Sequence, residues 1–293
     1  MRRLLRIVGY LALAVVVLVF LAAGGIWFAG GRAFAARISV PPETFDARDG
    51  NVDRGKHFVM IVANCSGCHR ANLGGGSIID DPNVAVIDAP NLTAGAGGIG
   101  AKFSDTDFER AIRHGVAPDG TALAVMPSEM YSAFSDADLR DVIAYVRSVP
   151  PVNRTTKPRA IGFMGRLGIV LGKFSPDAYH IDQSAAHVAS LPPAANASYG
   201  RYLVRLGNCT SCHKANFAGG KVFDMRVANI TPAAIGSWTL AQFEQTLRTG
   251  RDPSGHRLST QMPWPEIGQM NDQELTAVYL FLKTVPPVTQ AKT

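Results

Sequence analysis

The sequence has few of the features that mark several classes of protein. Only 4 of its 293 residues are cysteine, too few for a scaffold built on disulfides. With 47% hydrophobic and 18% charged residues, it contains too much apolar side chain for a chain that never packs. The net charge is +6, but three of the 29 basic residues precede an N-terminal apolar run, which leaves 26 against 23 acidic residues. Because no other basic cluster remains, we expect no nucleic-acid partner.

The N-terminal apolar run predicts a membrane anchor. Residues 7–29 form 23 consecutive positions with no ionisable side chain except Tyr10, enough to cross a hydrocarbon core of about 30 Å. Arg2, Arg3 and Arg6 precede the run, so the positive-inside rule places residues 1–6 in the cytoplasm and the remaining chain outside. A cleaved signal peptide is the alternative, but its apolar region would be shorter, at about 7–15 residues.

The four cysteines form two short motifs, each followed at once by a histidine. The motifs are Cys65-Ser66-Gly67-Cys68-His69 and Cys209-Thr210-Ser211-Cys212-His213. This is the c-type haem attachment pattern: the spacing lets two thiols reach the two vinyl groups of one porphyrin, and the adjacent imidazole can then bind the iron. A zinc site would need a further Cys or His cluster, and a thioredoxin-like site would need a neighbouring βαβ pattern. Neither is found, so the sequence predicts two covalently bound haems c.

The two motifs belong to two copies of one repeating unit. Asn91-Leu92-Thr93 corresponds to Asn229-Ile230-Thr231, Met126-Pro127 to Met262-Pro263, and the segment from Ser135 to the one from Asn271. The first copy carries a longer loop after its haem motif, at residues 74–89. The repeat therefore predicts two domains of similar fold.

Each copy has the periodicity of a helical domain. Helices are predicted at residues 54–63 and 199–206, from near Ser104 and Thr239, and after capping boxes that begin at Ser135 and Asn271. No alternating strand pattern of useful length is found. We predict an all-α fold of two tandem domains with haem cores, at residues 50–152 and 197–288, joined by a connector at residues 153–196. The connector's apolar piece, residues 161–174, is expected to pack between the domains; a helix at the membrane interface is the alternative.

Methionines are the expected distal ligands of the two irons. Met126 and Met262 stand at equivalent places in the two copies, nine residues before the cap of the last helix. A thioether ligand raises the potential of a haem, which suits an electron carrier. Met130 is the competitor for the first site. The sequence thus predicts His69 with Met126 and His213 with Met262 as metal ligands, and Cys65, Cys68, Cys209 and Cys212 as the attachment residues.

The other histidines are weaker ligand candidates, because none recurs in both copies. We therefore predict that His57, His114, His180, His187 and His256 are surface or loop residues. The segment at Pro90 is a better candidate for a supporting role. A backbone carbonyl there, and its counterpart at Ala228, could accept the Nδ1–H of the motif histidine and fix the imidazole.

These features together resemble cytochromes c of the monohaem and dihaem class. The likeness rests on both CxxCH motifs, the Asn-Leu/Ile-Thr segments, the Gly-x-x-Pro-x-Gly turns at Gly115 and Gly250, the Met-Pro pairs and the closing helices that end in Val-Pro-Pro-Val. More narrowly, the chain resembles the membrane-anchored cytochrome subunits of periplasmic alcohol, gluconate and aldehyde dehydrogenases. Those subunits commonly carry three haems, whereas this chain has two motifs. In that family the methionine of Met-Pro is the distal ligand.

The expected function is electron transfer rather than catalysis. We predict a non-catalytic subunit, anchored in the bacterial inner membrane with its haem domains on the periplasmic side. It would pass electrons from a periplasmic dehydrogenase to a quinone, a soluble cytochrome or a terminal oxidase. The alternative is a dihaem enzyme, peroxidase-like or thiosulfate dehydrogenase-like, with one open haem and a nearby acid–base group.

Overall fold

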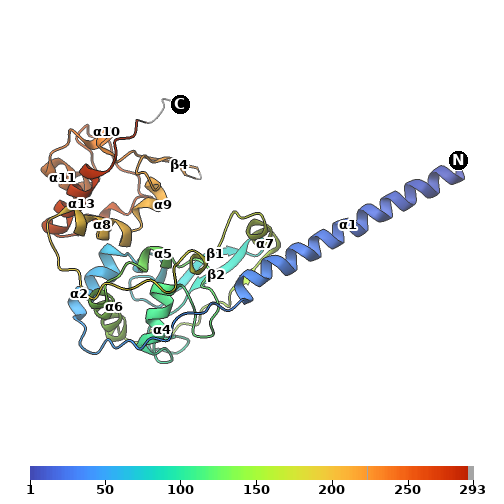
Figure 1. Cartoon of the computed structure of the whole chain (residues 1–293), viewed down its shortest axis with the longest axis horizontal. Coiled ribbons are helices and arrows are strands. Elements are labelled where there is room, and N and C mark those ends of the chain that lie inside the picture. The colour runs from blue at the N-terminus through green and yellow to red at the C-terminus, as the bar shows by residue number, and fades with distance from the viewer. Residues whose placement is uncertain (223, 290–293) are drawn as a thin grey trace.

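The computed structural model describes residues 1–222 and 224–289. Helix α1 (Arg2–Ala35) projects from a body that consists of two helical units (Figure 1). The first unit contains α2 (Val52–His57), the π-helix η1 (Phe58–Val62), α3 (Ser66–His69), α4 (Asp105–Glu109), the π-helix η2 (Arg110–His114), α5 (Ser128–Tyr131) and α6 (Asp136–Ser148). The second contains α8 (Ala197–Leu206), α9 (Cys209–His213), α10 (Pro232–Ile235), α11 (Leu240–Thr249), α12 (Trp264–Ile267) and α13 (Asp272–Thr284).

The predicted helices are present, and their caps explain where the closing helices begin. Asn271 accepts a hydrogen bond from the Glu274 amide while the Glu274 carboxylate accepts one from the Asn271 amide, which completes a capping box. At α6 only half of the predicted box forms: Ser135 accepts from the Asp138 amide, but the Asp138 carboxylate binds Arg54 and Tyr202 instead. A tertiary contact thus replaces a local one.

In each unit the first and last helices cross at a glycine. A Cβ on Gly55 would collide with the Asp141 carbonyl of α6, and a Cβ on Gly200 would collide with the Ala277 carbonyl of α13. The two glycines are 145 residues apart, whereas Cys65 and Cys209 are 144 apart. The first unit therefore has one extra residue between crossing and motif, and the π-helix η1 lies in that interval.

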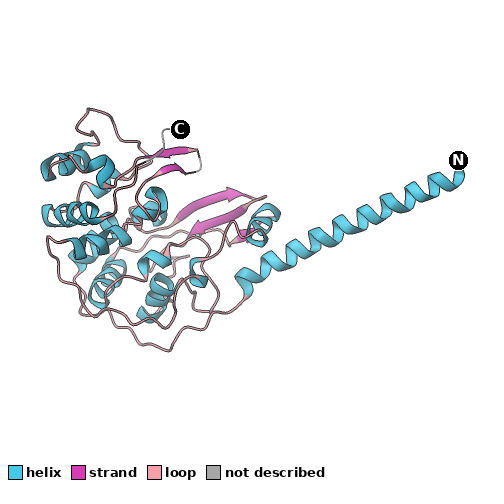
Figure 2. Ribbon diagram, turned by 45° about the horizontal axis from the view of Figure 1, so that its top comes forward, coloured by secondary structure: helices cyan, strands magenta, loops and turns pink. Residues whose placement is uncertain are grey.

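The prediction of an all-α fold needs a correction, because both units carry a small antiparallel hairpin (Figure 2). β1 (Gly76–Asp81) pairs with β2 (Ala85–Ala89), which also pairs with β3 (Ala160–Ile161); β4 (Gly220–Val222) pairs with β5 (Met225–Val227). The strands are short. Alternating burial is clear only in β2, where Ala85, Ile87 and Ala89 point inward, so periodicity alone gave little indication of them.

The apolar piece of the connector does not pack between the units as predicted. It forms α7 (Phe163–Val170), which lies against the β1–β2 turn and the end of α1, at the edge of the first unit from which α1 projects (Figure 1). The 3₁₀ helix η3 (Asp177–Tyr179) follows it. Tyr179 donates a hydrogen bond to the Ala33 carbonyl and further ties the connector to α1.

The two units meet through one hydrophobic core and two equivalent polar pairs. Buried side chains of both units, such as Phe134 and Leu206, belong to the same cluster. Tyr202 of the second unit donates to Asp138 of the first at 2.6 Å, and His57 of the first binds Glu274 of the second at 2.8 Å. His57 and Tyr202 are 145 residues apart, and Asp138 and Glu274 are 136 apart, so the interface has approximate two-fold symmetry.

We expect Gly200→Ala to destabilise the fold, because the added methyl group would force α8 away from α13. The free energy of unfolding should fall by about 1–3 kcal/mol, measured by urea denaturation followed by far-ultraviolet circular dichroism. Gly168→Ala is the matched control, since no heavy atom lies within 4 Å of its added Cβ. Equal stability of the two variants would contradict a close helix crossing.

Candidate functional site

The two predicted attachment motifs lie at equivalent places, on the single-turn helices α3 and α9. All four cysteines are free thiols. Burial raises the pKa of Cys65 to about 12 and that of Cys209 to about 11. Each motif therefore offers two thiols on one helical turn, with a histidine at its end.

Each motif histidine is held by one backbone carbonyl, as predicted. His69 Nδ1 lies 3.0 Å from the Pro90 oxygen, and His213 Nδ1 lies 2.9 Å from the Ala228 oxygen. A carbonyl can only accept, so Nδ1 carries the proton and the Nε2 lone pair is free in the neutral ring. Burial lowers the pKa of both imidazoles. Neutral, oriented imidazoles are what a metal ion requires of histidine.

The Asn-x-Thr segments, found in the sequence only as repeats, position those carbonyls. Asn91 follows Pro90 and donates from Nδ2 to the Val152 oxygen at 2.6 Å; Asn229 follows Ala228 and donates to the Val288 oxygen at 2.7 Å. In both units the threonine amide donates back to the asparagine Oδ1. The segment beside the motif is thereby tied to the chain that leaves the closing helix.

The backbone around both motifs adopts the same uncommon conformation. Among the residues that the structure describes, six other than glycine have positive φ, three in each unit at matching places: Asn64, Arg70, Leu73, Asn208, Lys214 and Phe217. Such conformations cost energy in L-residues and cluster at functional sites. Their repetition shows that both motifs are built by one local plan.

The predicted methionine ligands also occupy matching positions. Met126 and Met262 are partly buried against the core, and in each the carbonyl accepts a hydrogen bond at 2.8 Å from the amide two residues on, that of Ser128 or Trp264. Met130, the competitor, points elsewhere: its sulfur lies 3.9 Å from Thr210 Oγ1, inside the second motif.

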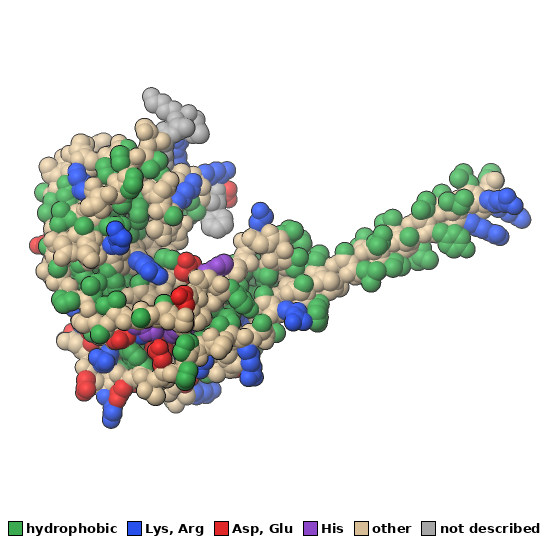
Figure 3. Space-filling view, viewed as in Figure 1, with side chains coloured by type: hydrophobic (Ala, Val, Ile, Leu, Met, Phe, Trp, Pro, Cys, Tyr) green, Lys and Arg blue, Asp and Glu red, His purple; other side chains and the backbone are tan. Residues whose placement is uncertain are grey.

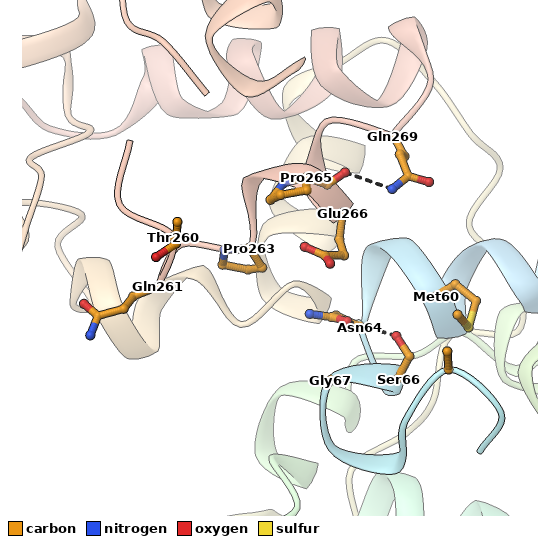
Figure 4. A pocket seen from close by; sticks show the side chains of 11 residues that line it. Met60, Asn64, Ser66, Gly67, Thr260, Gln261, Pro263, Pro265, Glu266 and Gln269 are labelled. Carbon is orange, nitrogen blue, oxygen red and sulfur yellow. Dashed lines mark hydrogen bonds between the residues drawn. The ribbon is translucent and has the colours of Figure 1, made fainter. Parts of the chain in front are cut away.

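We name residues 126–130 and 262–266 the methionine segments of the two units. A cavity of about 560 Å³ separates the first motif from the second methionine segment (Figure 4). Asn64, Ser66 and Gly67 line it from the first unit. Gln261 and Pro263, on either side of Met262, line it from the second. Because Met130 contacts the second motif in the corresponding way, each motif faces the methionine segment of the other unit.

These residues fit covalently attached haem. Each unit supplies two thiols separated by two residues, an adjacent imidazole with an unprotonated Nε2, and a thioether at a repeated position. The same donor set in both units fits one haem in each.

The prediction that the remaining histidines are surface or loop residues is wrong for His114, which is 2% exposed. Gln183 explains its burial: the Gln183 amide donates to the Ala178 oxygen, so its Oε1 accepts from His114 Nδ1 at 2.7 Å. Nε2 then lies 3.3 Å from Oε1 of the fully buried Glu109. No local pattern indicated that His114 is buried, because Gln183 comes from the connector.

Glu109, His114 and His187 place their ligand atoms within 4.8 Å of one another, close enough for a metal ion. A guanidinium occupies the same region, however. Arg113 Nη1 lies 3.5 Å from Glu109 Oε1 and 3.1 Å from His187 Nδ1. Since Arg113 already supplies a positive charge there, we interpret the group as a buried ion-pair network.

Comparison with known proteins gives one family match and several curated relatives. The family model described as cytochrome c matches residues 52–150 and 197–286. The fructose dehydrogenase cytochrome subunit of Gluconobacter japonicus is 28% identical over 276 residues, which cover 84% of this chain and 54% of that one. The gluconate 2-dehydrogenase cytochrome c subunit of Pantoea cypripedii is 28% identical, over 82% of this chain and 60% of that one.

A third relative is similar in length. The protein described as diheme cytochrome c-type from Cereibacter sphaeroides is 25% identical, over 91% of this chain and 94% of its own. By contrast, the chain spans only about half of the fructose dehydrogenase subunit.

The buried network predicts a pH-dependent stability. Burial lowers the pKa of His114, but the Glu109 carboxylate and Gln183 outweigh it and raise the pKa above its ordinary value. Because the pKa of His114 is higher in the folded than in the unfolded state, its protonated form stabilises the fold. This stabilisation is complete below the unfolded-state pKa of about 6.5 and is lost as the pH rises through the folded-state pKa. We therefore expect His114→Gln to cost more free energy of unfolding at about pH 5.5 than at about pH 9.

Urea denaturation at both pH values measures this difference. His180→Gln, at an exposed histidine, controls for the loss of an imidazole elsewhere. The interpretation fails if the cost of His114→Gln is the same at both pH values.

Proposed function

The chain belongs to the cytochrome c family, and from that premise we propose that it is a dihaem electron carrier with no catalytic side chains. One observation carries the proposal: in both units the motif imidazole is fixed through Nδ1, and a partly buried methionine stands at an equivalent position. Two filled coordination spheres suit electron transfer, whereas dihaem enzymes need an open or labile iron position.

The proposed site residues follow from this placement. Cys65 and Cys68 in the first unit, and Cys209 and Cys212 in the second, form the thioether links. His69 and His213 bind iron through Nε2, since Nδ1 donates to a carbonyl. Haem, when bound, supplies one-electron iron chemistry. The chain orients the imidazoles, buries the sites and adjusts their potentials.

Met126 and Met262 are the proposed distal ligands. The contact of Met130 with Thr210 supports this choice, because it directs the Met130 sulfur to the second motif. The equal main-chain geometry at Met126 and Met262 supports it further.

The mutual approach of the two units supports electron transfer within the chain. Each motif faces the methionine segment of the other unit across the interface. The side chains at this boundary include the buried pairs Tyr202–Asp138 and His57–Glu274, which hold the two units in one arrangement. We propose that electrons pass between the two sites here.

The relatives' names suggest the kind of partner. Two of them are cytochrome subunits of fructose and gluconate dehydrogenases. We propose that this chain likewise accepts electrons from a periplasmic dehydrogenase and delivers them to a quinone, a soluble cytochrome or a terminal oxidase.

We also propose that residues 7–29 anchor it in the inner membrane, with domains at 50–152 and 197–288 on the periplasmic side. Within the described residues, α1 is the one helix long and apolar enough to span a membrane.

Replacing one methionine should change one site. We expect Met126→Ala to lower the potential of a single haem by on the order of 100 mV, because the thioether favours the ferrous iron. Potentiometric titration followed by visible spectroscopy measures both haems. Met130→Ala is the control, and it should change neither haem potential by more than a small part of that amount. Equal shifts of both haems, or none, would exclude one methionine for each haem.

The carrier proposal itself is tested with carbon monoxide. The spectrum of the dithionite-reduced, membrane-purified wild-type protein should not change on adding carbon monoxide, because both sixth positions are filled. Met126→Ala, with one position opened, serves as the positive control and should bind the gas at one haem. Binding by the wild type would instead favour the dihaem enzyme.

A further inference from the structure

Helix α7 is apolar on its surface rather than in its interior. None of its residues is buried. We name the α7 stripe as the five exposed apolar residues Phe163, Met164, Val170, Leu171 and Phe174, which are 39–60% exposed. Phe163 and Val170, like Met164 and Leu171, are seven residues apart, which places them along one side of the helix and its C-cap. Phe174 lies beyond the helix end and stacks on Phe34. Exposed apolar surface of this kind marks a contact with another apolar phase.

The helix lies at the level where the apolar tract of α1 ends. Arg166 of α7 donates from Nη1 to the Trp27 carbonyl at 2.7 Å, and its guanidinium lies 4.1 Å from the centre of the Trp27 ring. Gly30 allows this approach, since a Cβ there would collide with Arg166. The ring of Phe34 stacks on that of Phe174, with 6.4 Å between the ring centroids. If residues 7–29 span the hydrocarbon core, α7 therefore lies at its boundary.

Residues typical of the membrane interface surround this position. Trp27 and Phe28 are more than half exposed at the end of the tract, and aromatic side chains of this kind are enriched at the headgroup level. Arg32, over the Phe28 ring, and exposed Lys173 carry positive charge, which favours anionic lipid. Figure 3 shows hydrophobic side chains along α1 and on the neighbouring α7.

The hairpin of the first unit fixes α7 to the first haem motif. At the turn, the Met164 amide donates to the Asn83 carbonyl at 2.9 Å. At the other end, Arg70, next to His69, donates to the Ser77 carbonyl, and the Gly75 amide donates to the His69 carbonyl. The longer loop after the first motif is thus a brace between that motif and α7.

We propose that the α7 stripe lies in the lipid interface of the membrane that α1 spans, and that it holds the first haem unit against that membrane. The inference rests on the proposed anchor. The occupant is the bilayer, because the stripe continues the apolar surface of α1 at the depth where the tract ends.

The test uses the full-length holoprotein in vesicles of phosphatidylcholine and phosphatidylglycerol, doped with a phospholipid that carries a diazirine in its acyl chain. After irradiation, lipid adducts are mapped by mass spectrometry of tryptic peptides. Cleavage after Arg159, Arg166 and Lys173 isolates α7 in two peptides, residues 160–166 and 167–173. We expect adducts on both and on α1, and few on residues 258–283, where Leu280 is as exposed as Phe163.

Charged variants make the test specific. Leu171→Glu should reduce lipid adducts on the two α7 peptides by about tenfold, because a carboxylate at this position would have to enter the apolar part of the lipid interface. Adducts on α1 should persist. Leu280→Glu, the matched control, should change neither. Adducts on α1 without adducts on α7 would overturn the inference and leave the anchor intact, and would point to a protein subunit or a second copy as the stripe's occupant. Absence of adducts on α1 would refute the anchor itself.

Discussion

The hydrogen bond from each motif imidazole to one backbone carbonyl is the contact on which the construction of each unit depends. An imidazole that binds a metal through Nε2 is oriented by a hydrogen bond that its Nδ1–H donates to a fixed acceptor. The Pro90 and Ala228 carbonyls supply that place. Their positions are set by asparagines that bind the chain beyond the closing helix. The helix crossings at Gly55 and Gly200 place that helix in turn. Much of each fold therefore serves to orient one imidazole.

The same logic extends across the unit interface. His57 with Glu274, and Tyr202 with Asp138, are equivalent pairs related by the repeat. The acceptors, Asp138 and Glu274, are each the third residue of a closing helix. The Glu274 carboxylate makes the contact between units in addition to its local cap, and the Asp138 carboxylate makes it in place of one. A buried polar pair defines one relative arrangement more sharply than apolar packing does. In this arrangement each motif faces the methionine segment of the other unit.

Departures from the repeat are concentrated in the first unit. Its longer hairpin supports α7, its η1 accommodates one extra residue, and its middle helix carries the buried Glu109–Arg113–His114 network. In the second unit, Thr249 stands where the first has His114. All three additions lie in the unit that contacts α1. The first unit thus combines a cytochrome c domain with the structure that joins it to α1.

The sequence alone determined what depends on neighbours along the chain. The CxxCH spacing, the repeated Met-Pro pairs, the N-caps at Ser135 and Asn271 and the uncharged N-terminal tract act over a few residues or one helix, so their patterns are readable. The tertiary structure decided what depends on distant partners. Strands β1 and β2 need each other's register, His114 is buried by Gln183 of the connector, and α7 packs on α1 rather than between the units. These contacts join residues that are close only after folding, and no local period records them.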